Sequence, residues 1–472
     1  MSYKNLADLK KLGNDYRFLL CADMYQLTMS AVYFAENRES EEVVFECFVR
    51  GIKTEVNNKG DFYYFSGEKV INKMMNKIKE IFLNDEQRNA FVESFLEMVI
   101  PKVAENKKNI VEKAVREKIK EEIKFDYRVL KENTLVTPLI PVFMFKGERW
   151  IGQLIETMIT NIINGKTGYN TALKTGNLNQ EEIIRFKNIT LGIFDEELPD
   201  DEIFNKYAEK LEKRADEYKN SINEFGEITE AAFRRAPGFY AAYIASDIAL
   251  KKEWLATSNT TLYFIEGKNI LNKIGGSFAH SFVMGYKNEA EAFKKWLEYY
   301  PKSILLIDSY DVMSAVDTII NEKMDCSYVR IDSEPLDIYA KDVQRKFLNA
   351  GLKTKIYLSS DITPERIIEF KQNNIPFARI MAGTKYINCW EVEKINCGFV
   401  YKITVNSING KINFPEKKAT GKKNYPGYKY VIFGKNEVVM YYSNKNVNIK
   451  FGFDYMTEAE KISNVLRIER VK

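Results

Sequence analysis

Four short apolar runs recur through residues 300–390 at a spacing of roughly 25 residues. They occupy residues 303–307, 328–331, 355–358 and 378–381. Segments with helical spacing lie between them, and one of these opens with Thr363 as a helix cap and Pro364 in the first turn. Strand and helix patterns that alternate in this way predict parallel strands joined by right-handed crossovers. We therefore predict an α/β barrel-like unit in this part of the chain.

Polar or glycine residues follow each of these apolar runs. They are Asp308, Asp332, Ser360, Asp361 and Gly383. In a parallel barrel the carboxyl ends of the strands meet on one face, and that face carries the active site. An aspartate after a strand can equally be the cap of the next helix, so each residue alone leaves both interpretations open. Together on one face, these residues predict a polar site.

Two other segments are strongly charged and carry apolar residues at helical spacing. They are residues 69–124 and 199–223, and we predict helices in both. The second follows Asp200 and Asp201 and is interpreted as an amphipathic helical hairpin on the surface. We expect these helices to be scaffold or insertions rather than parts of a site.

Composition indicates a large globular protein whose charges are balanced. Hydrophobic residues make up 45% of the 472 residues and aromatic residues 13%, which allows a sizeable core and several domains. The 70 basic residues nearly match the 66 acidic ones, so the net charge of +4 gives no reason to expect nucleic acid. The basic pairs 417–418 and 422–423 could hold phosphate, although a solvated loop is the favoured interpretation.

Cysteine use and the absence of long apolar runs favour a cytoplasmic protein. The five cysteines have no metal-ligand spacing and are odd in number, which is typical of reduced thiols. We find no start typical of a signal peptide and no apolar run approaching about 18 residues, so we expect no membrane span.

The chain contains a single histidine, His280. A lone histidine beside Phe278 and Phe282 is more often a structural residue than a catalyst. The small residues 275–277 before it and a strand-like run after it favour instead a close approach of the backbone to a ligand. One histidine also excludes a zinc protease motif and a histidine metal cluster, so we expect no metal centre built by the protein.

Nine sequence blocks resemble, in the same order, those of nicotinate phosphoribosyltransferases. They are residues 23–29, 45–50, 153–157, 234–236, 257–259, 279–281, 308–311, 330–333 and 425–427. The resemblance implies an irregular α/β barrel of the type II phosphoribosyltransferase kind at 140–398. It also implies a smaller α/β domain formed by residues 1–139, with a helical insertion at about 69–124, and completed by strands from 399–472.

The resemblance implies phosphoribosyl transfer from phosphoribosyl pyrophosphate (PRPP) to nicotinate in NAD biosynthesis, assisted by ATP and Mg²⁺. His280 matches the histidine that is transiently phosphorylated, and Asp308 matches the carboxylate that holds it. A neutral imidazole whose other nitrogen is held can attack a phosphoryl group. The resemblance also implies a homodimer with shared active sites, and we expect that assembly here.

The other site residues follow from the resemblance alone. Arg234 matches the arginine on the carboxylate of the base, where a planar guanidinium fits well. Tyr25 matches a ring that stacks on the pyridine from the partner subunit, and Asp332 matches the carboxylate on the ribose hydroxyls. Matches to substrate-binding positions are also found at Asp23, Arg50, Thr257, Arg330, Ser360, Gly383 and Thr384, with Arg50 on the pyrophosphate side and Gly383–Thr384 as a phosphate-binding turn.

Ser258 bears on the choice of substrate. Relatives that use nicotinamide carry an aspartate at this point, which accepts the amide N–H. A carboxylate would be repelled by that aspartate, whereas a serine hydroxyl can donate to it. The pattern at 257–259 is therefore expected to select nicotinate.

Three departures from the family pattern leave alternatives open. Ala231 replaces a stacking phenylalanine, with Phe233 displaced from that position. Glu334 and Pro335 follow Ser333 where the family has glycine and aspartate, and the usual Glu-Gly signature is missing around 132–134. The alternatives are transfer to nicotinamide or another pyridine, and a ligand-sensing paralogue without turnover. Retention of the single histidine argues against the paralogue.

Overall fold

The computed structural model describes residues 6–120, 122–408, 410–415, 426–427, 429–433, 437–442 and 445–450. The α-helices are α1 Leu6–Lys11, α2 Arg17–Leu20, α3 Met24–Ala35, α4 Glu68–Leu83, α5 Asp85–Val99, α6 Lys108–Lys118, α7 Arg149–Leu154, α8 Glu156–Lys174, α9 Gln180–Ile189, α10 Asp201–Ile222, α11 Phe239–Lys251, α12 Thr261–Glu266, α13 His280–Val283, α14 Glu289–Tyr299, α15 Val312–Asn321, α16 Leu336–Asn349, α17 Pro364–Gln372 and α18 Thr384–Ile387. The strands are β1 Glu42–Phe48, β2 Tyr63–Tyr64, β3 Phe125–Val129, β4 Leu135–Val136, β5 Phe143–Glu148, β6 Glu227–Glu230, β7 Ala256–Thr257, β8 Lys302–Leu306, β9 Cys326–Ile331, β10 Lys355–Leu358, β11 Arg379–Ala382, β12 Val400–Ile408, β13 Lys411–Asn413, β14 Lys429–Phe433, β15 Glu437–Tyr442 and β16 Lys445–Lys450.

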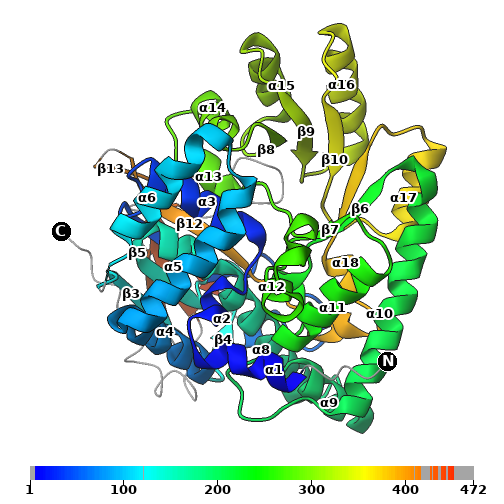
Figure 1. The fold of residues 1–472 in the computed structure, drawn as a ribbon. Helices are drawn as coiled ribbons and strands as arrows, with labels where there is room; N and C mark the ends of the chain where they lie inside the picture. Colours follow the sequence, from blue (N-terminus) through cyan, green and yellow to red (C-terminus); the bar gives the residue numbers. More distant parts are fainter. Residues whose placement is uncertain are drawn as a thin grey trace.

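A six-stranded sheet contains the four predicted strands in the order β7-β6-β11-β10-β9-β8. Every neighbouring pair in it is parallel. The sheet curls into a half-barrel on the right of Figure 1, with α15 and α16 at its upper end. Helices α15, α16 and α17 lie between these strands, as predicted. The side chain of Thr363 caps α17 by accepting the backbone N–H of Arg366.

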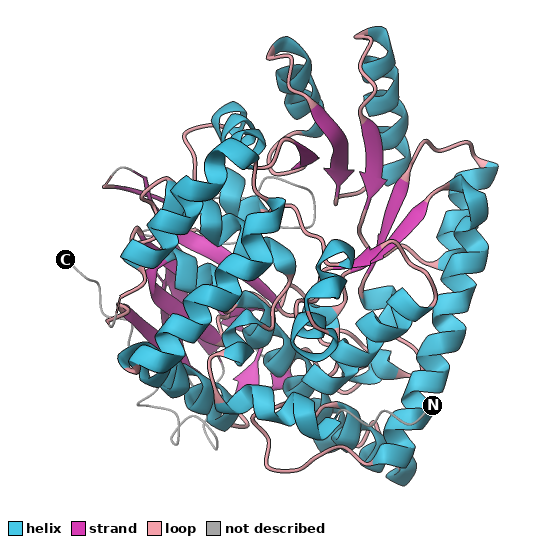
Figure 2. Cartoon of the chain, viewed as in Figure 1, coloured by secondary structure: helices cyan, strands magenta, loops and turns pink. Residues whose placement is uncertain are grey.

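A second, antiparallel sheet brings together the early and late parts of the chain. Its order is β13-β12-β1-β5-β3, with β1 in the middle between β12 and β5. All residues of β1 after Glu42 are buried, as expected for a central strand covered on both faces. Figure 2 shows the two sheets on opposite sides of the molecule, with helices between and around them.

The charged helical segments differ in part from the prediction. The first forms α4, α5 and α6, which end at Lys118. The second is one continuous 22-residue helix, α10, so the expected hairpin is wrong. The side chain of Asp200 caps α10 by accepting the N–H groups of Glu202 and Ile203, and the apolar face of the helix packs on α11 and α17 (Figure 1). Because Tyr218 in α10 donates to the carbonyl of Ile362 at 2.7 Å, this helix is part of the barrel wall.

The core is continuous across both sheets, and the largest side chains buried in it include Trp150, Trp254 and Trp296. Burial raises the pKa of the Cys21 thiol to about 12 and that of Cys389 to about 12, which keeps both thiols protonated. Within the described ranges, no helix is both long and apolar enough to cross a membrane. The basic pairs 417–418 and 422–423 lie outside the described residues.

Candidate active site

A cavity of about 110 Å³ lies between the two sheets. Residues of the parallel sheet line one side of it, among them Arg330 on β9 and Met381 on β11. The antiparallel sheet supplies Phe45 from β1 and Tyr401 from β12. The polar lining residues are Tyr25, Glu156, Arg234, His280, Ser281, Arg330, Asp332 and Lys402. The structure thus brings together five of the residues expected at a site, from segments far apart in sequence.

His280 is the first residue of the short helix α13 and is 8% exposed. Its Nδ1 lies 3.0 Å from the hydroxyl oxygen of Ser309. Its Nε2 lies 4.0 Å from Asp308 Oδ1 and 3.9 Å from Asp332 Oδ2, beyond hydrogen-bond length. Ser309 is thus the hydrogen-bond partner at Nδ1, Asp308 lies near the other ring nitrogen, and its role in holding the histidine stays a prediction.

The backbone around His280 differs from the strand-like run that the sequence suggested, because α13 is helical. The close approach expected at the small residues is real, but it is made to the protein itself. A Cβ on Gly276 would come within 2.6 Å of the backbone nitrogen of Tyr25, so only glycine fits there. Arg330 holds the same loop by donating from Nη2 to the carbonyl of Phe278 at 3.0 Å.

The strand ends place Asp308 and Asp332 on one face, as predicted. The hydroxyl of Ser333 donates to Asp308, and that of Ser359 donates to Asp332 Oδ1 at 2.9 Å. One ligand atom from each of Asp308, Asp332 and His280 lies within 4.8 Å of the others. Carboxylate oxygens in such a group suit a hard divalent cation.

Two other strand ends do not reach the cavity lining. Ser360 and Asp361 after β10 have φ angles of 99° and 46°, which makes a tight turn. Gly383 precedes α18, and a Cβ there would meet the carbonyl oxygen of Ala231 at 3.0 Å. Packing against Ala231 explains this glycine, and Thr384 begins a helix of only four residues.

Arg234 is held between two buried carboxylates. Its Nε lies 3.1 Å from Asp23 Oδ2, and its Nη1 lies 2.8 Å from Glu156 Oε1. Tyr25 presents its ring to the guanidinium, whose carbon is 5.3 Å from the ring centroid. Nη2 has no hydrogen-bond partner among the described residues, and one third of the side chain is exposed. One edge of the guanidinium is therefore open to a ligand.

Ser258 acts behind this arginine rather than in the cavity. Its hydroxyl donates to Asp23 Oδ1 at 2.6 Å, and it does not line the cavity. Burial raises the pKa of Asp23, while Arg234 and the Ser258 hydrogen bond act in the opposite direction. Thr257 also faces away from the cavity, since its hydroxyl donates to Glu230 at 2.5 Å. The structure thus shows no direct access of Ser258 to a ligand.

The chain was compared with protein-family models, curated proteins and solved structures. No family model matches it. A nicotinate phosphoribosyltransferase of Mycobacterium tuberculosis is 30% identical over 211 residues, which is 43% of either chain. The Bacillus subtilis nicotinate phosphoribosyltransferase is 25% identical over 421 residues, 86% of this chain and 72% of its own. A crystal structure of a candidate nicotinate phosphoribosyltransferase from Saccharomyces cerevisiae has a TM-score of 0.59 at 17% identity, covering 86% of this chain and 94% of that one.

The chain is similar in sequence to nicotinate phosphoribosyltransferases over most of its length, and it shares the fold of a solved structure of this kind. Its match to the Mycobacterium tuberculosis enzyme spans less than half the length of that relative. The half-barrel and the separate antiparallel sheet agree with the fold of the solved structure.

The aromatic walls depart from the family expectation. Phe233 is fully buried against Phe239, at 5.6 Å between ring centroids, and so does not replace the ring missing at Ala231. Phe45 and Tyr401 stack at 4.9 Å and line the opposite wall, a pair that the sequence analysis did not identify. Tyr25 lines the cavity from the same chain as His280, and its contribution across a dimer stays a prediction.

Two more of the residues singled out from the sequence lie at the margin of the site. Burial and the charge of Arg235 lower the pKa of Arg50 to about 10, whereas Asp332 raises it. Arg50 is thus near the carboxylate end of the cavity without lining it. Glu334, which stands where the family has glycine, forms two hydrogen bonds with Arg366 at 2.6 and 2.7 Å. That pair turns Glu334 toward α17.

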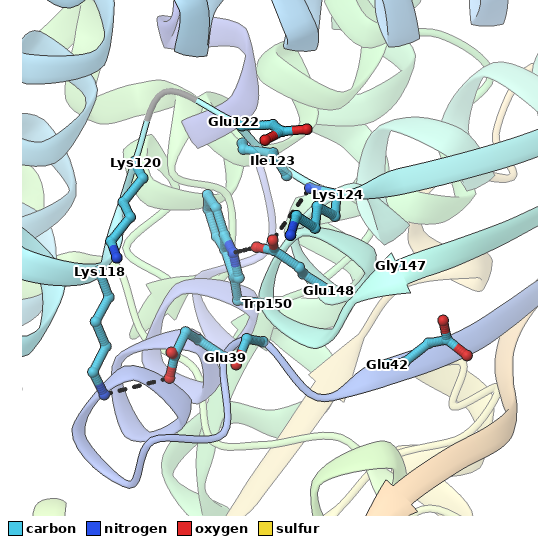
Figure 3. Close-up of a pocket in the computed structure, with 11 residues that line it drawn as sticks. Glu39, Glu42, Lys118, Lys120, Glu122, Ile123, Lys124, Gly147, Glu148 and Trp150 are labelled. Atoms are coloured by element: carbon cyan, nitrogen blue, oxygen red, sulfur yellow. Dashed lines mark hydrogen bonds and ion pairs between the residues drawn. The ribbon is translucent and has the colours of Figure 1, made fainter.

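A larger hollow of about 470 Å³ lies elsewhere, on the antiparallel sheet (Figure 3). Several of its polar groups contact one another. Trp150 donates to Glu148 at 2.8 Å, and Lys118 lies 3.4 Å from Glu39. Charges of both signs, some of them paired with each other, give no site comparable with the cavity at His280.

Proposed function

We propose that this protein transfers the phosphoribosyl group of PRPP to nicotinate in NAD biosynthesis and couples the transfer to ATP hydrolysis. One observation carries the proposal: Arg234, Tyr25 and His280 line a single cavity in a chain similar to nicotinate phosphoribosyltransferases. The pyridine nitrogen would attack the anomeric carbon of PRPP. The bond from that carbon to pyrophosphate breaks, giving nicotinate mononucleotide.

Arg234 and Tyr25 would bind nicotinate, the pyridine base. The open Nη2 edge of Arg234 can donate to the carboxylate of nicotinate, which is the group that a guanidinium binds best. The Tyr25 ring lies against the guanidinium and also lines the cavity, so it can cover the pyridine face. Phe45 and Tyr401 supply an apolar wall across the cavity.

His280 would couple the transfer to ATP hydrolysis by accepting a phosphoryl group. Its Nε2 would attack the γ-phosphorus, the bond to ADP breaks, and the phosphohistidine is later hydrolysed. The Ser309 hydroxyl at Nδ1 fixes the ring during these steps. Asp308 and Asp332 would hold Mg²⁺, which neutralises phosphate charge when bound. Binding sites for PRPP at Arg50, Arg330 and the Gly383–Thr384 turn, and a cytoplasmic homodimer, belong to the same proposal.

A second candidate is the same transfer to nicotinamide. Glu156 lines the cavity and could accept an amide N–H, as an aspartate does in relatives that use nicotinamide. Nicotinamide also brings no further negative charge to an arginine that already contacts two carboxylates.

Product analysis separates these candidates. The protein is incubated with PRPP, ATP and Mg²⁺ while nicotinate, nicotinamide and quinolinate compete, and products are identified by mass spectrometry. Nicotinate mononucleotide as the main product supports the proposal. Nicotinamide mononucleotide supports the second candidate, and no mononucleotide, together with ligand binding, would identify a sensing paralogue.

A further inference from the structure

Glu156 lines the cavity and lies at the centre of a buried hydrogen-bond network. It is the first residue of α8 and only 4% of it is exposed. Its Oε1 accepts from Arg234 at 2.8 Å, and its Oε2 accepts from Gln26 and Gln153, each at 2.9 Å. Three N–H donors thus converge on two carboxylate oxygens.

The network reaches both ends of the cavity. Gln153 Oε1 accepts the hydroxyl of Ser281 at 2.6 Å, and Ser281 directly follows His280 in α13. On the other side Arg234 forms an ion pair with Asp23, which in turn accepts the hydroxyl of Ser258. The orientation of the guanidinium is therefore set by groups on α3, α7, α8 and the loop after β7.

We propose that Glu156 is the positioning residue for Arg234, an inference that rests on the proposed function. With Nε held by Asp23 and Nη1 by Glu156, the guanidinium plane cannot rotate, so Nη2 keeps one position in a side chain that lines the cavity. Binding a ligand carboxylate then costs little further ordering of a long side chain.

Charge alone predicts the opposite role, which makes the proposal testable. A carboxylate ligand would be the third negative group around Arg234, after Asp23 and Glu156. If the charge of Glu156 mattered most, its removal would strengthen the binding of nicotinate. If its positioning of Arg234 matters most, its removal weakens that binding.

Glu156→Gln distinguishes the two roles, because a glutamine offers one oxygen to the three donors and removes the charge. We expect the Kd for nicotinate, measured by calorimetry, to rise about tenfold and the KM for PRPP to change less than about twofold. Glu156→Gln in an Arg234→Ala background should add almost nothing, because the residue acts through Arg234.

Two further variants guard against a trivial loss of structure. Gln153→Met removes one donor and the Ser281 contact while Glu156 stays, and it should raise the Kd for nicotinate by about two- to fivefold. Glu182→Gln is the matched control: Glu182 is also 4% exposed, but it pairs with Lys394 and caps α9 away from the cavity. Glu182→Gln should leave the Kd unchanged.

The outcomes separate this inference from the proposed function. Nicotinate that binds the wild type without forming product would refute the function alone. Tighter or unchanged binding by Glu156→Gln, or an undiminished effect in the Arg234→Ala background, would refute the positioning role alone. A wild type that does not bind nicotinate would overturn both.

Discussion

Glu230 offers a quantitative test of the buried polar network behind the site. It ends β6, and only 1% of it is exposed. Its carboxylate accepts the N–H of Ala232 and the hydroxyls of Ser246 and Thr257. Burial nevertheless raises its pKa from 4.5 to about 7, because three hydrogen bonds only partly offset the loss of hydration. Glu230→Gln removes this titration and keeps the size of the side chain.

The direction and size of the effect follow from linkage. The folded state holds the proton more tightly than the unfolded chain, so the contribution of Glu230 to stability is complete below pH 4.5 and is lost as the pH rises through about 7. Each tenfold change of an acid equilibrium corresponds to about 1.4 kcal/mol, which gives roughly 3 kcal/mol in total. Between pH 5 and pH 8 the free energy of unfolding should fall by about 2.5 kcal/mol through this group.

Urea denaturation from pH 5 to pH 8 measures the effect as the difference between wild type and Glu230→Gln. The variant should gain about 2.5 kcal/mol relative to wild type over this range. The contributions of the other titrating groups are the same in both proteins and cancel when the two free energies of unfolding are subtracted. Glu202→Gln is the control, since Glu202 is exposed on α10 and pairs with Lys206. Parallel curves for wild type and Glu230→Gln would show that Glu230 is already ionised across the whole range and would refute the reasoning.

Three further predictions concern the cavity. His280→Ala should abolish ATP hydrolysis coupled to synthesis while leaving the fold intact, and acid-labile, base-stable phosphate should form on the wild type; an active wild type without such phosphate would contradict this. Arg234→Ala should lower kcat/KM for nicotinate by well over tenfold, since losing such a pair costs about 2–5 kcal/mol, and should affect the use of PRPP much less. Mixing Tyr25→Ala with His280→Ala subunits should restore no activity beyond the sum of the two, because both residues line one cavity in one chain; recovery after confirmed subunit exchange would show that Tyr25 acts across a dimer.

The parallel strands were predictable because each is a short apolar run with its own helix, so the pattern is local. The position of Asp308 and Asp332 on one face followed from the same pattern, since parallel strands end together. The single helix α10 was not predictable as such, because charged helical spacing fits one helix or two equally well.

The contacts of the site could not be predicted, because they join distant segments. Ser258 donates to Asp23 across 235 positions, and no sequence signal pairs them. The burial of Phe233 likewise depends on Phe239 and on the packing of α11. Glu156 stood within a recognised block, but its role appears only when Gln26, Gln153 and Arg234 are placed around it.

The pairing of β1 with β12 has a consequence for synthesis of the chain. Phe48 lies opposite Val400, so about 350 residues must be made after β1 before its partner leaves the ribosome. At typical elongation rates this takes roughly 20 to 70 s. During that time a strand destined for the centre of a sheet leaves the backbone N–H and C=O groups of one edge unpaired and its apolar side chains partly uncovered, which is the kind of surface that aggregates or recruits chaperones. Contacts of such sequence separation also slow folding, so this sheet should be the last part of the protein to form.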